Sequence, residues 1–396
     1  MIEIFTSSTL AQNLQPIIAS SSLWKDKDLH VIIIANPHSG GFTQPKTAMS
    51  NLKILQEESA KIKDEQPQVK TIEMRTYDTK YPSHSMEFVE STFMDMLPLL
   101  KDTEKTNHRV LFVTAGGDGT SLEVQTKLLE LSRTSDDYRK IIQKCYCVLR
   151  LPFGTGNDGS DGRTIEETLL RLSKPRGIEL QKAVEVVVEG EKKGTYGKWQ
   201  KSKKENVFPP WYSFNIASIG IDAFITHMTN KMKDKFPGDF YQIWVDLACL
   251  FYNLSYKPGH AKIEMFKNGE KVGYYEGGIE FALLGASGHR TYGSNHKILP
   301  SDNDSVCITP RMSLFKKLST KSSFNDGTHY GKAYSKFFDA DKMVINYDEN
   351  ILVQVDGEAH LLQKENFPIV IKHTEPVIPV ITVQDDPINH GTVKID

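Results

Sequence analysis

The first part of the chain alternates short apolar runs with longer segments in which apolar residues recur every three or four positions. Residues 30–35 (HVIIIA) are apolar at all but the first position, as expected of a strand covered on both faces of a parallel sheet. In residues 121–132, by contrast, Val124, Leu128 and Leu131 fall on one face of a helix. These patterns predict strands over residues 30–35, 70–77, 109–115 and 145–151, and helices over residues 45–63, 84–101, 121–132 and 165–172. The alternation indicates an α/β domain with a mostly parallel sheet flanked by helices.

Beyond Pro175 the pattern changes to closely spaced short runs that are rich in Val, Ile, Tyr and Phe. Gly, Asn and Asp separate them, which is typical of an antiparallel sandwich or barrel. The runs cover residues 184–188, 213–219, 262–266, 279–285, 305–309, 342–347 and 351–355, and residues 240–254 are expected to form an inserted helix. We therefore predict a lead segment (1–27), an α/β domain (28–175), a C-terminal antiparallel β-sandwich domain (176–372) and a tail (373–396) that could fold back onto the first domain.

Composition narrows the class of protein. The chain has 396 residues, 39% of them hydrophobic, and a formal net charge of −2, so it has no global field to recruit nucleic acid. The first residues carry no basic leader, and no apolar run is long enough to span a bilayer. Four cysteines do not make a disulfide framework, and we interpret Cys145 and Cys147, on one strand, as core residues rather than zinc ligands. A cytoplasmic, reducing setting is expected.

The sequence AGGDGT, residues 115–120, follows the third expected strand and precedes a helix. In open α/β sheets ligands bind at this edge, and the N–H groups at a helix start favour anions. Gly116, Gly117 and Gly119 have no Cβ to block a phosphate. Asp118 would repel a phosphate unless a cation such as Mg²⁺ lay between them. The alternative is a tight turn in which Asp118 is the N-cap.

Two further turns of the same kind end the first and fourth strands. NPHSGG, residues 36–41, offers Asn36, Ser39 and Gly40, and PFGTGND, residues 152–158, again pairs glycines with an acidic residue. Because parallel strands end at one edge of a sheet, the three turns together indicate a nucleotide cleft. A fourth motif, VDGE at residues 355–358, taken alone reads as a β-hairpin turn.

Taken together, the motifs resemble the diacylglycerol kinase catalytic family, which also contains sphingosine kinases, ceramide kinases and bacterial lipid kinases. NPHSGG, GGDGT, PFGTGND, NIASIGIDA (215–223), the stretch 283–304 and VDGE are similar to the family's motifs in order and spacing, over roughly residues 30–372. The chain departs from the family at Gly159, Ser160 and Asp161, and has a single glycine, Gly293, where the family has three in a row. These departures concern the acceptor more than the phosphoryl donor.

The resemblance implies an ATP-dependent lipid kinase that transfers the γ-phosphate to a lipid hydroxyl, with Mg²⁺ as cofactor and the active site in the cleft between the two domains. It favours diacylglycerol as acceptor and phosphatidic acid as product. It also implies Asp356 as general base, with Glu358 and Asp118 completing the catalytic set, and Asp118, Asp158 and Glu358 as metal-binding residues. The implied nucleotide contacts are Asn36, Ser39, Gly40, Gly116, Gly117, Gly119, Thr120, Gly154, Thr155 and Asn157, and Asp222 is a candidate contact for the acceptor or the nucleotide.

Two other classes of function stay open. One is a kinase for a sphingoid base, another lipid or a polyol; the other is a non-catalytic protein that binds nucleotide or lipid. The complete set of acidic residues argues against the second. We expect peripheral contact with a membrane surface, and a homodimer is left open. Residues 191–204 hold six lysines and are interpreted first as a solvated hairpin loop, and alternatively as a contact for anionic lipid headgroups.

Overall fold

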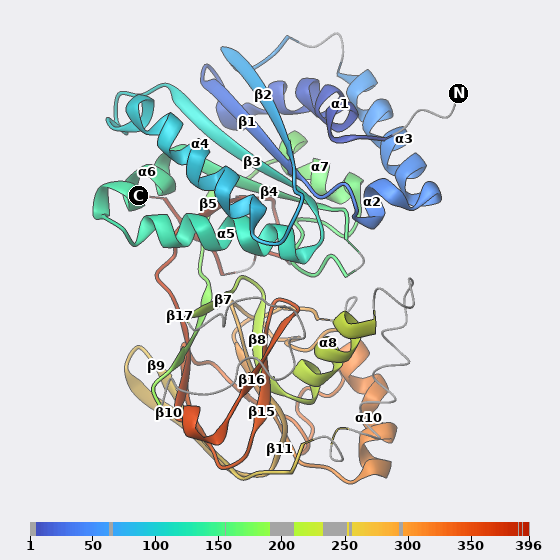
Figure 1. Cartoon of the computed structure of the whole chain (residues 1–396), viewed down its shortest axis with the longest axis vertical. Coiled ribbons are helices and arrows are strands. Elements are labelled where there is room, and N and C mark those ends of the chain that lie inside the picture. Colours follow the sequence, from blue (N-terminus) through green and yellow to red (C-terminus); the bar gives the residue numbers. More distant parts are fainter. Residues whose placement is uncertain are drawn as a thin grey trace. The chain divides into compact units, whose positions relative to one another are not determined.

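The computed structural model describes residues 5–62, 66–154, 156–190, 210–232, 252, 256–292, 296–386, 388–389 and 391–395. Within residues 230–232 it describes the backbone alone. The chain divides into two compact units, one made of residues 1–182 with 376–396 and the other of residues 183–375 (Figure 1). The expected helix over residues 240–254 and the lysine-rich residues 191–204 lie outside the described residues.

A seven-stranded sheet forms the centre of the first unit, in the order β19-β5-β18-β4-β3-β1-β2. Strands β2, β1, β3, β4 and β18 run parallel, whereas β5 and β19 continue the sheet antiparallel to β18. The strands are β1 (Asp28–Ala35), β2 (Thr71–Asp78), β3 (His108–Gly116), β4 (Tyr146–Pro152), β5 (Gly177–Gln181), β18 (Ile378–Thr382) and β19 (Val393–Lys394). The central strands β3 and β4 are buried along almost their whole length, which explains their continuous apolar sequence.

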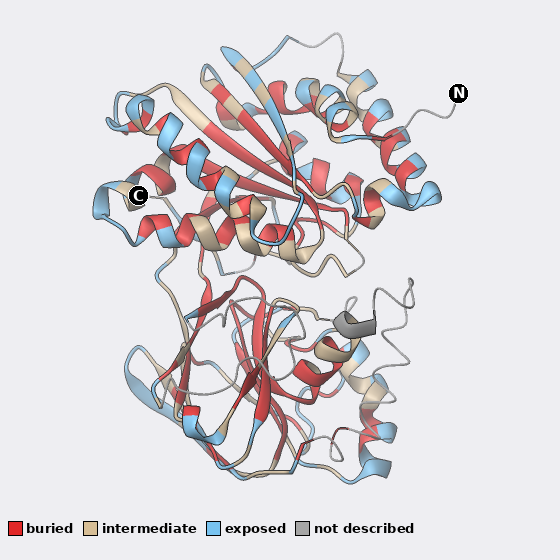
Figure 2. Ribbon diagram, in the orientation of Figure 1, coloured by how far each residue is buried: buried red, intermediate tan, exposed pale blue. Residues whose placement is uncertain are grey.

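Helices cover both faces of this sheet. One buried cluster joins α1, α3 and α7 to β1, β3 and β4, while α4, α5 and α6 lie together on the opposite face (Figures 1 and 2). The helices are α1 (Ser7–Ala19), α2 (Gly40–Thr43), α3 (Pro45–Lys61), α4 (His84–Leu100), α5 (Asp118–Ser132), α6 (Asp136–Cys145) and α7 (Ile165–Ser173), with a short 3₁₀ turn at Ser22–Trp24. Side-chain hydroxyl caps at Thr6, Ser135 and Thr164 fix the starts of α1, α6 and α7.

Buried ion pairs fasten the C-terminal segment to the first unit. Asp161 accepts from the backbone N–H of Arg150 (2.7 Å) and from its guanidinium (2.6 Å), and Asn389 donates to the same carboxylate (3.1 Å). Arg171 donates to the backbone oxygen of Asp161 (2.5 Å) and to both carboxylate oxygens of Asp386. All five residues are buried. This buried ion network links β4, the loop before α7, α7 itself and the segment after β18.

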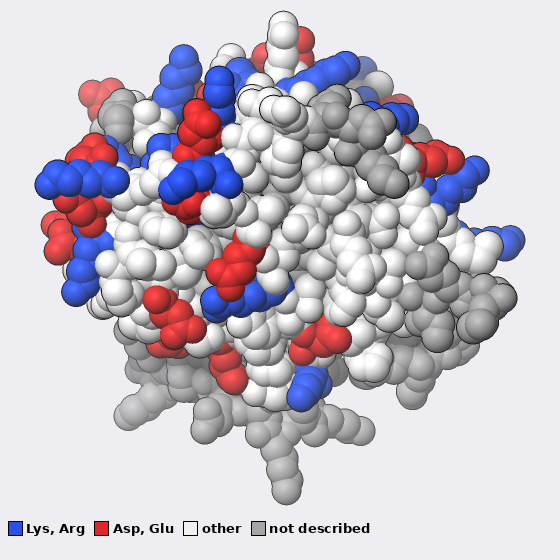
Figure 3. Space-filling model, turned by 90° about the horizontal axis from the view of Figure 1, so that it is seen from above, with Lys and Arg blue, Asp and Glu red and all other residues white. Residues whose placement is uncertain are grey.

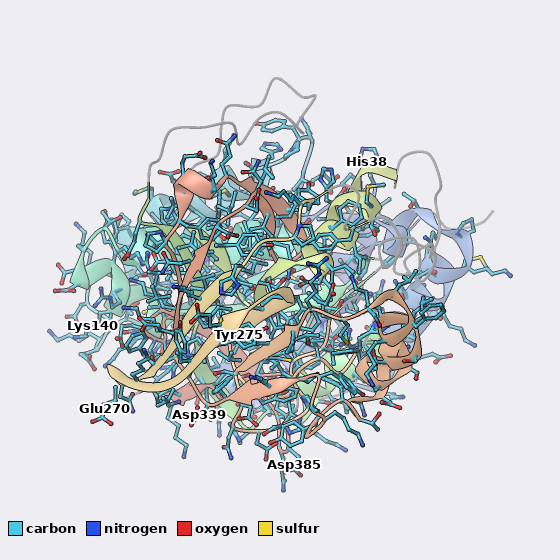
Figure 4. The ribbon with its side chains drawn as sticks, turned by 90° about the horizontal axis from the view of Figure 1, so that it is seen from below. His38, Lys140, Glu270, Tyr275, Asp339 and Asp385 are labelled. Atoms are coloured by element: carbon cyan, nitrogen blue, oxygen red, sulfur yellow. The ribbon has the colours of Figure 1, made fainter. Side chains whose placement is uncertain are left out.

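The second unit contains two antiparallel six-stranded sheets, in the orders β10-β9-β14-β17-β6-β7 and β13-β12-β11-β8-β15-β16. The strands are β6 (Val184–Val188), β7 (Trp211–Ser213), β8 (Ile216–Gly220), β9 (Ala261–Lys267), β10 (Glu270–Gly277), β11 (Ile279–Gly285), β12 (Val306–Pro310), β13 (Lys336–Phe338), β14 (Lys342–Tyr347), β15 (Ile351–Val355), β16 (Glu358–Leu362) and β17 (Ile369–His373). A short 3₁₀ turn spans Lys364–Asn366. One buried cluster takes residues from both sheets, so they form a sandwich with a shared core. Glu270 lies at the turn of the β9–β10 hairpin (Figure 4).

Two helices, α8 (Ile221–Met232) and α10 (Leu314–Asp326), contribute to a second cluster with residues of β8, β11, β12, β15 and β16. These helices therefore cover the outer face of the sheet that contains β8 and β15. No described helix combines the length and the apolar character that a membrane span requires. On the face shown in Figure 3, Lys and Arg side chains are interspersed with Asp and Glu rather than gathered by sign.

The fold class predicted from the sequence is confirmed, with a mostly parallel sheet followed by antiparallel sheets. The prediction that Cys145 and Cys147 share a strand is wrong, because Cys145 is the last residue of α6. Both thiols are buried, and burial raises the pKa of each. The sequence analysis also missed α1, α6 and α10.

Candidate functional site

Three turns meet at the carboxyl ends of β1, β3 and β4, which are neighbours in the first sheet. The N–H of Asn36 donates to the carbonyl of Ala115 (2.9 Å), which links the end of β1 to the end of β3. The N–H of Gly41 donates to the carbonyl of Phe153 (2.9 Å), which links the first turn to the one after β4. The three glycine-containing segments singled out in the sequence therefore form one connected group.

Glycine is required where these turns touch one another. A Cβ on Gly154 would lie 2.6 Å from the Cα of Gly117, and a Cβ on Gly41 would lie 2.4 Å from the ring of Phe153. A Cβ on Gly116 would lie 2.3 Å from the hydroxyl oxygen of Thr120. A Cβ on Gly119, in contrast, would meet no atom within 4 Å. Contact between turns thus accounts for Gly154 and Gly41, and contact with Thr120 accounts for Gly116, whereas a Cβ on Gly119 would lie in open space.

The carboxylates of Asp118 and Asp158 both lie beside Gly156. A Cβ on Gly156 would be 3.2 Å from Oδ2 of Asp118 and 3.6 Å from Oδ2 of Asp158. Asp118 is the first residue of α5, and its Oδ1 accepts from the N–H of Gly159 (3.0 Å). The N-cap of α5 is Gly117, so the alternative in which Asp118 caps the helix is wrong. Arg163 donates to Asp158 (3.0 Å) and sets the orientation of its carboxylate.

This pair of carboxylates fits the requirements of Mg²⁺. The described residues contain no cluster of three or more His, Cys, Asp or Glu side chains in ligand geometry. Mg²⁺ usually keeps several waters and takes only one or two carboxylates together with substrate phosphates. Asp118 and Asp158, at the start of a 15-residue helix whose N–H groups favour anions, supply such a pair.

Asn157, Asn36 and Ser39 hold the turns in shape. Asn157 adopts a positive φ of 55°, accepts from the N–H of Gly154 (2.8 Å) and donates to the carbonyl of Pro152 (3.3 Å). Ser39 donates to the carbonyl of Asn36 (2.9 Å), just before Gly40 begins α2. These hydrogen bonds give Asn157 and Ser39 a role in positioning the backbone. Thr155 lies outside the described residues.

Asp356 and Gly357 form the two-residue turn between β15 and β16, with φ values of 43° and 89°. Positive φ at both positions is the signature of a type I′ hairpin, which favours Asp-Gly. The carboxylate turns inward and accepts from the Ser213 hydroxyl (2.5 Å) and from the backbone N–H groups of residues 214–216 (2.5, 3.1 and 3.1 Å). Burial raises the pKa of Asp356, and these four donors offset part of that effect. The residue therefore forms the turn and also directs its carboxylate inward.

Glu358 and Asp222 occupy different environments in the second unit. Glu358 is the exposed first residue of β16. Asp222 begins α8 and accepts from the Ser218 hydroxyl, and its Oδ1 is buried without a hydrogen-bond partner in the part of the chain that the structure describes. Burial raises the pKa of the Asp222 carboxyl to about 7. The backbone carbonyl of Asp222 accepts from the Tyr292 hydroxyl (3.2 Å).

The structure thus brings Asn36, Ser39, Gly40, Gly116, Gly117, Gly119, Thr120, Gly154, Asn157, Asp118 and Asp158 together in the first unit, while Asp222, Asp356 and Glu358 belong to the second. Sequence reasoning missed Phe153, which contacts Gly41, and Arg163, which orients Asp158. It also recorded Asp161 only as a departure from a motif. A buried arginine within a strand, Arg150, was the available signal that a buried acidic partner had to lie nearby.

The chain resembles known proteins in its three-dimensional structure. No protein-family model matches the chain. No curated protein matches it either. Among solved structures, a crystal structure from Bacillus anthracis strain Sterne, provisionally described as a diacylglycerol kinase, aligns with a TM-score of 0.53 and 17% identity over 91% of this chain and 99% of its own.

A second structure from the same strain, described as a diacylglycerol kinase, aligns with a TM-score of 0.50 and 14% identity over 91% of this chain and 98% of its own. At such identities the likeness concerns the fold. The chain therefore has the fold of solved structures described as diacylglycerol kinases, as its sequence motifs predict.

Proposed function

We propose that the protein is an ATP-dependent kinase that phosphorylates a lipid hydroxyl, with diacylglycerol as acceptor and phosphatidic acid as product. The observation that carries the proposal is the pair Asp118 and Asp158 around Gly156, set in contacting glycine turns at the start of α5. Phosphoryl transfer depends chiefly on positioning and on neutralising the charge of the phosphates. Carboxylates that can hold Mg²⁺ beside an anion-binding helix start are suited to that task.

Each part of the chain has a distinct task in this scheme. The N–H groups at the start of α5 and the turns around Gly117 and Gly154 bind the phosphates. Asp118 and Asp158 hold Mg²⁺, which when bound neutralises phosphate charge. Asp356 accepts the proton of the acceptor hydroxyl at Oδ2, because Oδ1 already accepts three hydrogen bonds and Oδ2 only one.

An acceptor panel tests the proposal. Purified protein is incubated with radiolabelled ATP and Mg²⁺ and with diacylglycerol, a sphingoid base, a ceramide or a soluble polyol, and Asp118→Asn serves as the inactive control. We expect label in phosphatidic acid for the parent and a loss of at least about 100-fold in the control, as removal of a key electrostatic group costs. Label in a sphingoid base or polyol would move the acceptor to the alternative class. ATP binding without transfer to any acceptor would favour a non-catalytic nucleotide-binding protein.

Gly154→Ala should raise the dissociation constant for ATP about 5- to 150-fold, because overpacking costs about 1–3 kcal/mol and here pushes the turn away from Gly117. Isothermal titration with ATP and Mg²⁺ measures the effect. Gly177→Ala is the matched control, since its Cβ would meet no atom within 4 Å. Equal affinity in the parent and in Gly154→Ala would show that the contact between the two turns does not shape the ATP site.

Asp222→Asn should flatten the pH dependence of stability. The raised pKa of Asp222, about 7, means that the folded parent is stabilised at low pH and loses this contribution as pH rises through 7. Asparagine cannot ionise, so at pH 8 the free energy of unfolding of the variant should exceed that of the parent by about 1–2 kcal/mol. This difference should shrink toward pH 5. Urea unfolding across this range measures it, with the exposed Asp339→Asn as control. Parallel curves for parent and Asp222→Asn would contradict the assignment.

A further inference from the structure

Helix α10 in the second unit exposes the apolar residues of its first half, while the two residues that it buries fully are polar. Lys317 and Thr320 are its buried residues, whereas Leu314, Phe315 and Leu318 are 41%, 84% and 44% exposed. A helix at the surface of a soluble domain normally shows the opposite arrangement. Figure 2 shows exposed segments along the outer side of α10. The three exposed apolar side chains fall within five consecutive residues, so they form one patch, here named the α10 patch.

Specific contacts fix this orientation of the helix. The ammonium of Lys317 lies 2.6 Å from Oε2 of Glu280 on β11, and Oε1 of Glu280 accepts from the N–H of Met312 (2.8 Å). At the other end, Phe324 packs against the cluster on the outer face of the sheet. Removing either partner of a buried pair is costly, so the helix cannot easily rotate to bury the α10 patch.

The charged residues nearest to the α10 patch in the sequence are basic. From residue 305 to residue 325 the sequence contains no Asp or Glu. Arg311, Lys316 and Lys321 lie beside or within the patch, and Arg311 and Lys316 are exposed. The Lys316 ammonium lies 4.9 Å from the centre of the Tyr334 ring, which keeps it on the surface of the unit. Apolar side chains projecting from a basic rim suit a surface that is anionic outside and apolar beneath.

We propose that the α10 patch docks the protein onto an anionic lipid surface, with Leu314, Phe315 and Leu318 entering the interface and the basic residues contacting headgroups. A second copy of the chain fits the patch less well, because a two-fold interface would set each basic rim against its counterpart. Three side chains also fall far short of the roughly 800 Å² per partner that a stable interface buries.

This inference rests on the proposed function and names the surface by which the enzyme reaches a lipid acceptor. Helix α8, which begins with Asp222, contributes to the same buried cluster as Phe324 of α10. The docking helix and the candidate acceptor contact are therefore parts of one packed layer of the second unit.

Sedimentation with vesicles tests the proposal. The full chain is mixed with vesicles of phosphatidylcholine and phosphatidylserine, and the parent is compared with a Leu314→Ser, Phe315→Ser, Leu318→Ser variant. We expect the partition coefficient of the variant to be at least about tenfold lower, because three apolar side chains no longer enter the interface. The control is Val272→Ser with Tyr274→Ser on β10, where two exposed apolar residues of the same unit lie away from α10. Melting temperatures confirm that each variant is folded.

A charge variant gives the second arm. Arg311→Gln with Lys316→Gln and Lys321→Gln should lower binding about fivefold per residue on anionic vesicles and leave binding to pure phosphatidylcholine unchanged. The control neutralises Lys46, Lys101 and Lys174, which are exposed in the first unit. A parent that does not sediment, or a serine variant that sediments equally well, would overturn the proposal. A dimeric parent with a monomeric serine variant would instead assign the patch to a second copy.

The kinase assay is run in parallel with a short-chain diacylglycerol dissolved as monomers. Variants of the α10 patch should keep parental activity on this soluble acceptor, because docking is not needed there. Absence of phosphorylation with normal vesicle binding would reject the proposed function and leave the docking surface standing. Normal phosphorylation with unchanged vesicle binding in the serine variant would reject the docking surface and leave the proposed function standing.

Discussion

Asp356→Asn should lower kcat at least about 100-fold and leave the dissociation constant for ATP near the parental value, since a positioned general base contributes about 100- to 10,000-fold. Asn-Gly forms a type I′ turn as readily as Asp-Gly, so the hairpin itself is preserved. The amide presents an N–H₂ group where the carboxylate accepted hydrogen bonds, which should also lower the free energy of unfolding by about 1–3 kcal/mol. Steady-state kinetics and ATP titration on the folded variant separate the two effects.

Ser213→Ala is the matched control for Asp356→Asn. It removes one of the four donors to the Asp356 carboxylate but keeps the carboxylate itself. A purely structural role for Asp356 predicts similar losses of stability and near-normal kcat in both variants, whereas the base role predicts a large fall in kcat for Asp356→Asn alone. If Asp356→Asn kept more than about a third of parental kcat, far above what loss of a base allows, the base role would pass to Asp118.

Asp161→Asn should lower the free energy of unfolding by about 3–5 kcal/mol, the usual cost of removing one partner of a buried ion pair. Asp161 lies between two buried guanidinium groups, those of Arg150 and Arg171. With asparagine in its place, both cations stay buried and lose their shared counter-charge. Asp136→Asn is the control, because the side chain of Asp136 is 96% exposed and its ion pair is on the surface. This substitution should change the free energy of unfolding by less than about 1 kcal/mol. Denaturant unfolding of the three proteins measures the difference.

The difference in the free energy of unfolding between the parent and Asp161→Asn should depend on pH in the acid range. Burial would raise the pKa of Asp161, but Arg150 and Arg171 outweigh it and hold the pKa below its usual range. The stability that this carboxylate contributes is therefore fully present above the unfolded pKa of about 3.9 and is lost as pH falls through the lower folded value. The gap between parent and Asp161→Asn should be constant near neutrality and should narrow below about pH 4. A gap of constant size down to pH 2 would mean that the network does not depend on the charge of Asp161.

Local patterns predicted the layers of the fold because each strand carries its own burial signal. Residues 31–35 and 110–113 are apolar at every position, and the structure places them in β1 and β3 within a covered sheet. Helix α6 could not be predicted in this way, because most of its residues are polar and its buried side is narrow. Helix α10 escaped prediction for a stronger reason, since its buried residues are a lysine and a threonine and no hydrophobic period marks them.

The position of the loops that form the candidate site was predictable from the sequence, but the contacts between their residues were not. Three Gly-rich turns after three strands imply one edge of one sheet, and the structure places them there. Their glycines were attributed to the approach of a phosphate, whereas Gly154 and Gly41 are needed for contacts within the protein. A sequence pattern shows that a side chain is missing but does not show which neighbour requires its absence. The inward turn of the Asp356 carboxylate toward residues 213–216 likewise joins strands far apart in the chain.

The position of β18 has a consequence for how the protein is made. This strand lies between β4 and β5 inside the first sheet, yet it follows every strand of the second unit in the sequence. Until residues 378–389 emerge, β4 and β5 lack their common neighbour, and Arg150 and Arg171 lack Asn389 and Asp386. The second unit, being continuous, can fold while the first still waits with an open strand edge, which is the state most prone to wrong pairing. A truncation that removes residues 378–389 should therefore damage the first unit, although residues 5–182 are still made.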